Sequence, residues 1–496
     1  MKKLFLISIL LIASLVLVTA CGSSDDNDSA NNDGGNVTNN QTGQQDSTGD
    51  NVNVDTGDTG VQSFAFAPAE GETITIRYAN WNLGTEEDNN IERRMIQAFM
   101  DANPGIYVEI VEPFTDGWTE GLAVAASVQN LPDVFMVNDT GMMAANGWLL
   151  DITEISNSDG EFLNLPGAVR NATQIGNTVY TVPFAQFFLG YFVNRTMFEE
   201  LNLDPPEFGV SVDEFVNLVR HATDLNRPIV GLNYANQFAY WLPAARNSRF
   251  GFFGYDGTSY VLNSPEMIEA ITLAAELTAT GMTYGGLDYD QRAAFAAPWA
   301  GGAFNQGQVG MVWDGSWVID WLPRYAAEAN FELDFIGIPG GRTAVTLDIL
   351  GIAATTSHPE AAYLFARWMG HGVEGYLRRL EIARQNDINI NSLPLSGDQR
   401  VHDAFDSLIT IPGIRTALSE LGNALVDGNK IVPGHVQGRF YAQTGISIPG
   451  TDYDNATVNQ MIHHSIVGTI NFADHADAVN AASSAAMAEA RAAVGN

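Results

Sequence analysis

The sequence predicts an α/β fold whose centre is a parallel β-sheet. Strand-like and helix-like segments alternate from residue 73 onward, and the connections between them are short. Such alternation is typical of parallel strands joined by right-handed crossovers. The chain has 496 residues, of which 46% are hydrophobic. This length is enough for two or three domains with substantial cores.

The first predicted unit is a strand followed by a helix. In ITIRYAN (residues 74–80) every second residue is apolar, as expected for a strand with one buried face. Thr85 and Asp88 resemble a capping box, and apolar residues then recur at helical spacing over residues 91–100. The sequence NPG at 103–105 is predicted to end that helix.

Two further strands follow, at residues 106–112 and 132–138, with a helix at 118–129 between them. In parallel sheets, ligands bind beyond the carboxyl ends of the strands. Those ends carry Trp81 and Asn82 after the first strand, and Asn138 and Asp139 after the third.

The chain begins with a leader. Lys2 and Lys3 precede an apolar run over residues 4–18, which is short for a membrane span. The run leads into Val-Thr-Ala-Cys, which resembles the lipobox of bacterial lipoproteins. This resemblance implies a signal peptide over residues 1–20, cleavage before Cys21 and lipidation of its thiol. The alternative is an ordinary signal peptide with an incidental cysteine. Cys21 is the only cysteine, so the chain cannot form an intrachain disulfide.

Residues 21–71 are predicted to form an acidic, disordered tether. Ser, Asp, Asn, Gly, Thr and Gln dominate this stretch, which therefore lacks the apolar surface needed to fold. As a flexible coil it would span roughly 40 Å. It contains no complete calcium-binding loop of the EF-hand type.

The net charge of −35 limits the partners of the protein. Phosphates of nucleic acid and anionic lipid would be repelled, so we expect no nucleic-acid partner and membrane contact through Cys21 only. Lys430 is the only lysine after the leader. The acidic composition has two readings that stay open, namely solubility and an alkaline or saline habitat.

Six sequence blocks, in one order, resemble the extracellular solute-binding proteins of ABC importers, in the carbohydrate-binding group that includes maltose-binding protein. The likeness covers residues 73–496. The blocks are ANPGIYVEI, LPDVFMVND, GWLLDIT, VYTVPFAQFFLGYFVNRTMFEELNL, GQVGMVWDGSW and DILGIAATTSHPEAAYLFARWMG. The resemblance implies a two-lobed periplasmic-binding-protein fold (type II-like) with a ligand cleft between the lobes, which close on the ligand by a hinge motion.

The resemblance also implies a division of the chain. The first lobe would take residues 72–184 and a return segment at 335–377. The second lobe would take 185–334 and a helical remainder at 378–496. The chain would cross between them near residues 183–186, 335–339 and 378.

The segment GQVGMVWDGSWVIDWL (residues 307–322) contains three tryptophans. We expect a strand up to Trp313, a turn at Asp314 and Gly315, and a helix from Ser316. The resemblance implies that Trp317 stacks on a sugar ring, since an aromatic ring buries the apolar face of a sugar while carboxylates and amides bind its hydroxyls. Asp314 supplies such a carboxylate. Trp313 stays open between cleft and core, and Trp321 is predicted to lie in the core.

Other ligand-binding candidates come from predicted strand ends and from positions that match the family. Each competes with a simple packing role, and Arg439 stays undecided. These candidates are Trp81, Asn82, Asp139, Gln186 as a hinge residue, Trp241 and Asp348.

No catalytic, metal or cofactor signature is present. The sequence lacks G-x-S-x-G, H-E-x-x-H and G-x-x-x-x-G-K-[ST], and the adjacent His463 and His464 would point about 100° apart on a helix. Carboxylates are so numerous that a glycosidase pair could always be selected. We therefore expect no cofactor and no enzymatic activity.

The sequence thus predicts a monomeric, lipid-anchored solute-binding protein at the outer face of the cell membrane. It would capture a sugar or oligosaccharide by lobe closure and deliver it to the transmembrane subunits of an ABC permease. Two alternatives remain. One is a surface lipoprotein glycoside hydrolase, and the other is a binder of a non-sugar solute such as a polyamine or a metal chelate.

Overall fold

A computed structural model describes residues 63–88, 90–112, 114 and 117–495. The leader, Cys21 and residues 21–62 of the predicted tether lie outside this range. Over the described ranges, the protein contains no helix of the length and apolar character that a membrane crossing needs.

The fold is organised by one mixed sheet with the strand order β2-β1-β3-β10-β6-β8-β7, in which β11 also pairs with β10 and β9 with β6. A separate hairpin joins β4 and β5. The strands are β1 (Ile74–Ala79), β2 (Ile106–Ile110), β3 (Val134–Val137), β4 (Gln174–Ile175), β5 (Thr178–Val179), β6 (Thr181–Asn194), β7 (Val230–Leu232), β8 (Val309–Gly315), β9 (Leu333–Phe335), β10 (Ala344–Ile352) and β11 (Leu425–Val426).

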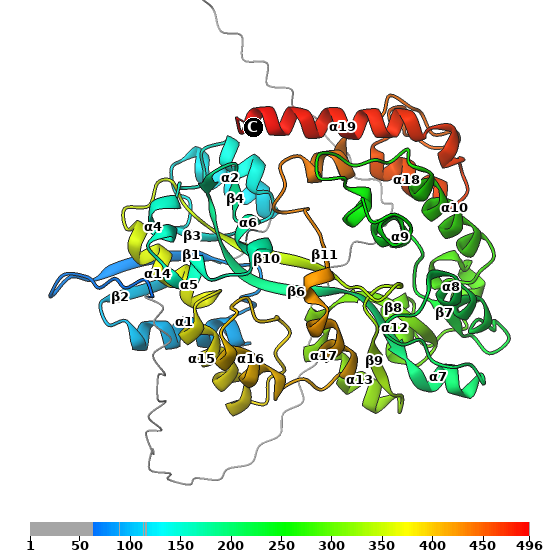
Figure 1. Cartoon of the computed structure of the whole chain (residues 1–496), viewed down its shortest axis with the longest axis horizontal. Helices are drawn as coiled ribbons and strands as arrows, with labels where there is room; N and C mark the ends of the chain where they lie inside the picture. Colours follow the sequence, from blue (N-terminus) through cyan, green and yellow to red (C-terminus); the bar gives the residue numbers. More distant parts are fainter. Residues whose placement is uncertain (1–62, 89, 113, 115–116, 496) are drawn as a thin grey trace, which may run out of the picture. The chain divides into compact units, whose positions relative to one another are not determined.

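Strand β6 is shared by two groups of elements. Its first part, from Thr181 to Leu189, pairs with β10, and its last part, from Leu189 to Asn194, pairs with β8 and β9. All fourteen residues are buried, which explains why TVPFAQFFLGYFVN is a nearly continuous apolar run. Figure 1 shows β6 running from the β1–β3 group to the β7–β9 group.

The first lobe is built on β1, β2, β3 and the end of β10. Strands β1 and β2 are parallel, as are β1 and β3, which confirms the predicted parallel pairing. The hydrophobic core over this sheet is contiguous. The helices that contribute to it, or pack against it, are α1 (Ile91–Ala102), α2 (Trp118–Ser127), α3 (Thr140–Ala145), α4 (Thr153–Asn157), α5 (Gly160–Leu163), α6 (Gly167–Asn171), α14 (Pro359–Met369) and α15 (Val373–Gln385).

Two local predictions in this lobe need correction. Thr85 and Asp88 do hydrogen-bond to each other, but they lie ahead of the helix rather than at its cap. Asn90 is the N-cap of α1, and its side chain accepts from the Arg93 N–H. The polar tether also ends earlier than residue 71, because Phe64 and Phe66 pack against the core.

The second lobe contains β7, β8 and β9 and has two hydrophobic cores. The first core includes α7 (Arg195–Glu200), α8 (Val212–His221), α9 (Phe238–Arg246), α10 (Pro265–Ala279), α18 (Val458–Ile466) and the alanine-rich α19 (Ala476–Ala493). The second includes α12 (Ala300–Asn305), α13 (Leu322–Glu328), α16 (Gln399–Asp406) and α17 (Pro412–Ser419), and the short α11 (Tyr289–Arg292) precedes α12.

Six short helices complete the description, and one of them, η5, is a π-helix. They are η1 (Phe252–Gly254), η2 (Tyr284–Gly286), η3 (Ser316–Asp320), η4 (Leu421–Asn423), η5 (Gln437–Tyr441) and η6 (Phe472–Asp474).

The return crossing lies later in the chain than the one inferred by resemblance. Residues 335–339 still belong to the second lobe, since Ile336 and Ile338 lie in its core, and the return is made by β10. Helix α15, which includes the expected exit point at Arg378, packs against α1 of the first lobe and also places Val373, Tyr376, Leu380 and Ala383 in the second core of the second lobe. Its Arg379 forms a buried two-bonded ion pair with Glu92 of α1, at 2.5 and 2.9 Å.

Breaking this pair should strand a buried charge. We expect Arg379→Met to lower the free energy of unfolding by about 3–5 kcal/mol, because Glu92 loses its partner in a site closed to water. The double variant Glu92→Leu/Arg379→Met, which removes both charges, should lose much less. Urea unfolding curves measure both. Equal losses in the single and double variants would show that the ion pair is not what fixes α15 to α1.

Candidate functional site

The site predicted from sequence lies where two strands meet β6 from opposite sides. Asp348 of β10 is opposite Ala185 of β6, and Gly315 at the end of β8 is opposite Leu189. Ala185 and Leu189 are four positions apart along β6, which is about 13 Å in an extended strand. The sheet therefore places the β10 candidates and the β8 candidates at neighbouring points along one strand.

The register between β6 and β10 shifts between Asp348 and Ile349, which are opposite Ala185 and Pro183. Phe184 has no partner in the ladder at this point. Proline cannot donate to the ladder, and such irregularities bend a strand and increase its twist. The irregularity thus lies in the part of the sheet that joins the two lobes.

Gln186 is buried next to this irregularity. It is opposite Leu347 of β10, and its carbonyl oxygen accepts a hydrogen bond of 2.7 Å from the Leu393 N–H. Its main chain is therefore committed to strand pairing, which suits the predicted position at a crossing.

Trp317, which follows β8, is the most exposed of the predicted site residues in the second lobe. Strand β8 continues to Gly315, and the chain then turns into the 3₁₀ helix η3 rather than the α-helix expected from Ser316. The Ser316 hydroxyl fixes this turn, since it accepts from the Phe188 N–H at 3.1 Å and donates to the Asn391 carbonyl at 3.0 Å. The Trp317 side chain is 40% exposed, and the edge-to-face contact with Phe187 (5.6 Å between centroids) supports one side of it.

The Trp317 ring also folds back over Gly315. A Cβ atom at Gly315 would lie 2.3 Å from the ring, so only glycine allows this position. The ring is thus held in a defined orientation while keeping exposed surface, which is what a flat stacking platform requires.

Asp314 stands directly beside this platform. Its carboxylate accepts from the Gly315 N–H at 2.7 Å, and this bond together with the nearby Trp317 indole N–H favours the charged form. Burial is the dominant influence and raises the pKa of Asp314 to about 6. An aromatic face and a carboxyl group therefore lie side by side at the end of β8.

Trp313 is partly buried, so its exposure is intermediate between that expected in the cleft and that expected in the core. Its ring packs at 5.2 Å from Tyr191 and 6.0 Å from Tyr240. Its backbone is held by Asn233, which accepts from the Trp313 N–H and donates to its carbonyl. Tyr240 and Asn233 were not identified from sequence, because α9 and β7 come to β8 only through the tertiary fold.

Arg439, undecided from sequence, is buried behind this aromatic group. Its guanidinium carbon lies 4.3 Å from the centre of the Tyr240 ring. Its Nη1 atom forms an ion pair with the Asp427 carboxylate at 3.6 Å. It also faces the rings of Phe252, Phe253 and Phe440. Arg439 thus contacts Tyr240, which in turn packs against Trp313.

Trp81 and Asp348 are predicted site residues of the first lobe, and Lys430 connects them. Trp81 is partly buried and packs edge to face against Trp118, at 5.1 Å between ring centroids. Lys430 forms an ion pair with Asp348, and its ammonium lies 5.6 Å from the centre of the Trp81 ring. Asn82 is exposed beside Trp81, and its N–H donates to the Asn80 side chain at 2.7 Å.

Asp139 is buried and has both oxygens occupied. It caps α3 by accepting from the Met142 N–H at 3.0 Å, and it accepts from the Gln437 side-chain amide at 2.9 Å. Burial raises its pKa. These contacts give Asp139 a structural role that the sequence comparison alone did not reveal.

Trp241 corrects one expectation. It is 0% exposed and lies in the core of the second lobe, with its indole N–H donating to the Tyr191 hydroxyl at 2.9 Å. The apolar face of α9 points inward there, so Trp241 presents no surface to a ligand.

Trp321, expected in the core, is only partly buried, and its ring packs against Tyr325 at 5.8 Å between centroids.

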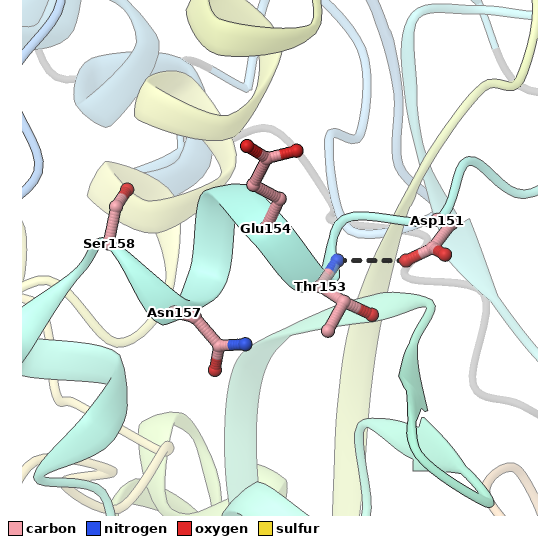
Figure 2. Close-up of a pocket in the computed structure, with 5 residues that line it drawn as sticks. All are labelled: Asp151, Thr153, Glu154, Asn157 and Ser158. Atoms are coloured by element: carbon pink, nitrogen blue, oxygen red, sulfur yellow. Dashed lines mark hydrogen bonds between the residues drawn. The ribbon is translucent and has the colours of Figure 1, made fainter.

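A separate surface hollow surrounds the short helix α4. Asp151, Thr153, Glu154, Asn157 and Ser158 line it, and Figure 2 shows the Asp151 carboxylate accepting from the Thr153 N–H at its edge. All five residues belong to one local segment, and none of them comes from the strand ends described above.

Within the described residues, no group of three or more His, Cys, Asp or Glu side chains could hold a metal ion.

The raised pKa of Asp314 predicts a pH dependence. Because the folded protein holds this proton up to about pH 6, against 3.8 for the ordinary group, the free energy of unfolding should fall as pH rises between these values. Asp314→Asn should remove that part of the slope. Unfolding curves of both proteins from pH 4 to 7 measure the difference, and a difference that stays constant over this range would contradict the assignment.

Comparisons with known proteins agree with this geometry. The sequence profile described as "Bacterial extracellular solute-binding protein" matches residues 84–370, which is more than half of the chain. The "Multiple sugar-binding protein" of Streptococcus mutans is 22% identical over 329 residues, covering 60% of this chain and 71% of the relative.

Solved structures share the fold. An ABC substrate-binding protein from Listeria monocytogenes, in complex with cycloalternan, aligns with a TM-score of 0.63 and 19% identity, over 84% of this chain and 100% of the other. The cyclic alpha-maltosyl-1,6-maltose binding protein from Arthrobacter globiformis aligns with a TM-score of 0.60 and 18% identity, over 84% and 100%. With its two-lobed α/β fold, the chain belongs to the family of bacterial extracellular solute-binding proteins.

Proposed function

We propose that this protein captures a sugar or oligosaccharide between its lobes and delivers it to an ABC permease. The observation that carries the proposal is the exposed Trp317 ring with the Asp314 carboxyl group beside it. A sugar ring has an apolar C–H face and a rim of hydroxyl groups, and this pair offers a surface for each. The printed names of the similar proteins, which bind multiple sugars, cycloalternan and a cyclic maltosaccharide, support the same class of ligand.

The proposed mechanism is capture without chemistry. Trp317, Asp314 and Trp313 would contact the sugar from the second lobe, and Trp81 with Asn82 from the first. Closure would bend β6 and β10 near the irregularity at Asp348, where ladder bonds are already interrupted. No bond of the sugar is made or broken in this scheme.

The remaining parts of the proposal concern the place of action. A diacylglycerol on Cys21 would hold a monomer at the outer face of the cell membrane, and residues 22–62 would allow it to reach the permease. The lipobox-like residues before Cys21 support this assignment.

A binding experiment tests the capture proposal. A thermal-shift screen of the full chain against neutral mono- and oligosaccharides should identify a ligand, since a molecule that binds only the folded state raises the melting temperature. For that saccharide, Trp317→Ala should lose about 1–3 kcal/mol of affinity. The melting temperature without ligand should hardly change, because the ring is substantially exposed.

The matched control is Trp299→Ala, which removes a 59% exposed tryptophan from the start of α12 and should leave affinity unchanged. The saccharide should also be recovered intact after incubation. Early melting of Trp317→Ala with normal affinity would assign Trp317 to the core. Cleavage products formed well above background would favour the glycoside hydrolase alternative.

Cys21→Ser tests the anchor. The variant should leave the membrane fraction while keeping the melting temperature of the native protein, because stable attachment requires acyl chains and the fold does not depend on them. Fractionation of cells after a salt wash measures this. Retention of the variant in the membrane fraction would show that another element attaches the protein.

A further inference from the structure

Lys430 is the only lysine in the described part of the chain. It lies between β11 and η5, in a linking segment that we define as residues 427–441. Its carbonyl oxygen accepts two hydrogen bonds of 2.9 Å from Thr140, one from the N–H and one from the hydroxyl. These bonds fix the backbone of Lys430 at the start of α3, so the position of its side chain is well determined.

The Lys430 ammonium occupies a position suited to a cation. Asp348, which is buried in β10, pairs with it, and the Trp81 ring lies 5.6 Å away. A carboxylate together with the face of an indole ring is the arrangement that binds ammonium groups of ligands. Both side chains are among the ligand-binding candidates, so this cation position belongs to the site itself.

We propose that Lys430 is a specificity-determining residue that fills this cation position and thereby excludes ligands carrying their own ammonium groups. Polyamines and amino sugars are the excluded class, and neutral saccharides are the accepted one. The second half of this statement rests on the proposed function, whereas the exclusion of amines does not.

Tethering makes the exclusion effective. A group attached through a short linker competes at an effective concentration in the millimolar range. A free amine at micromolar concentration cannot displace it from Asp348. An amine that bound elsewhere near Trp81 would in addition meet the repulsion of a like charge at short distance.

Removing the ammonium should reverse this selectivity. Without Lys430, Asp348 would be a buried carboxylate with no partner, which is a strongly unfavourable state. An external amine that entered the vacated space would neutralise it. A purely structural ion pair behaves differently, since its loss would lower stability without creating a binding site.

The test uses spermidine as the probe and the full chain as the protein. Calorimetric titrations would compare the native protein, Lys430→Ala and the double variant Lys430→Ala/Asp348→Asn, with circular dichroism to verify the fold of each. Lys430→Ala should bind spermidine at least tenfold more tightly than the native protein does. The double variant, which has the same space but no charge on residue 348, should lose that gain.

Two results would overturn the proposal. One is equal spermidine affinity in the native protein and in Lys430→Ala, and the other is a folded Lys430→Ala that binds no spermidine. If Lys430→Ala does not fold alone, its circular dichroism is measured with spermidine, which should restore the native signal where sodium chloride at equal ionic strength does not; no recovery would also overturn the proposal. These outcomes do not depend on saccharide binding. A failure of the sugar screen and a failure of this inference are therefore separate results.

Discussion

The arrangement of the molecule depends on the backbone hydrogen bonds of β6. One strand of fourteen buried residues pairs with β10 along its first part and with β8 and β9 along its last part. A strand with both faces buried cannot leave its backbone groups unpaired without a large cost. The two lobes are therefore joined through the ladder of β6, whose register shifts at Phe184. The end of β8 and the middle of β10 pair with β6 at neighbouring points along it.

The linking segment at residues 427–441 adds side-chain contacts on both sides of this ladder. Its two basic residues are Lys430, over Trp81 of the first lobe, and Arg439, over Tyr240 of the second. Each is paired with an acid attached to β10, because Asp348 lies in that strand and the Asp427 N–H donates to the Val345 carbonyl at 2.8 Å. Both aromatic halves of the site are thus connected to one strand through a salt bridge and a ring contact.

The parts of the fold that the sequence predicted correctly are those set by local pattern. The alternation in ITIRYAN and the helical spacing after Ile91 depend on neighbours a few residues apart, and both elements form as expected. Phe64 and Phe66 were missed because a polar composition over fifty residues outweighed two aromatic residues whose partners lie far away in the chain. Phe64, for example, packs against Tyr363.

The candidate site was harder to predict for the same reason. Trp241 and Trp317 both lie in the first half of a short helix, yet one is fully buried and the other exposed. That difference is decided by long-range contacts, such as the bond from Trp241 to the Tyr191 hydroxyl. The pairing of Asp348 with Lys430, 82 residues apart in the chain, likewise leaves no trace in the local sequence.

The charges of the molecule act at two ranges, and together they limit what can bind. At long range, a net charge of −35 repels anionic solutes and attracts cationic ones. If the net charge alone determined which solutes bind, the protein would favour polyamines. The acidic and aromatic side chains of the site would also suit a polyamine. At short range the position that would hold an ammonium group is already occupied by Lys430, and the Asp427 carboxylate is committed to Arg439. The exposed surface that remains for a ligand at the end of β8 is an indole ring beside a carboxyl group whose pKa is raised to about 6 by burial. Neither the net charge nor the Lys430 ammonium opposes the binding of a neutral molecule with an apolar face and hydroxyl groups. A saccharide has this chemistry.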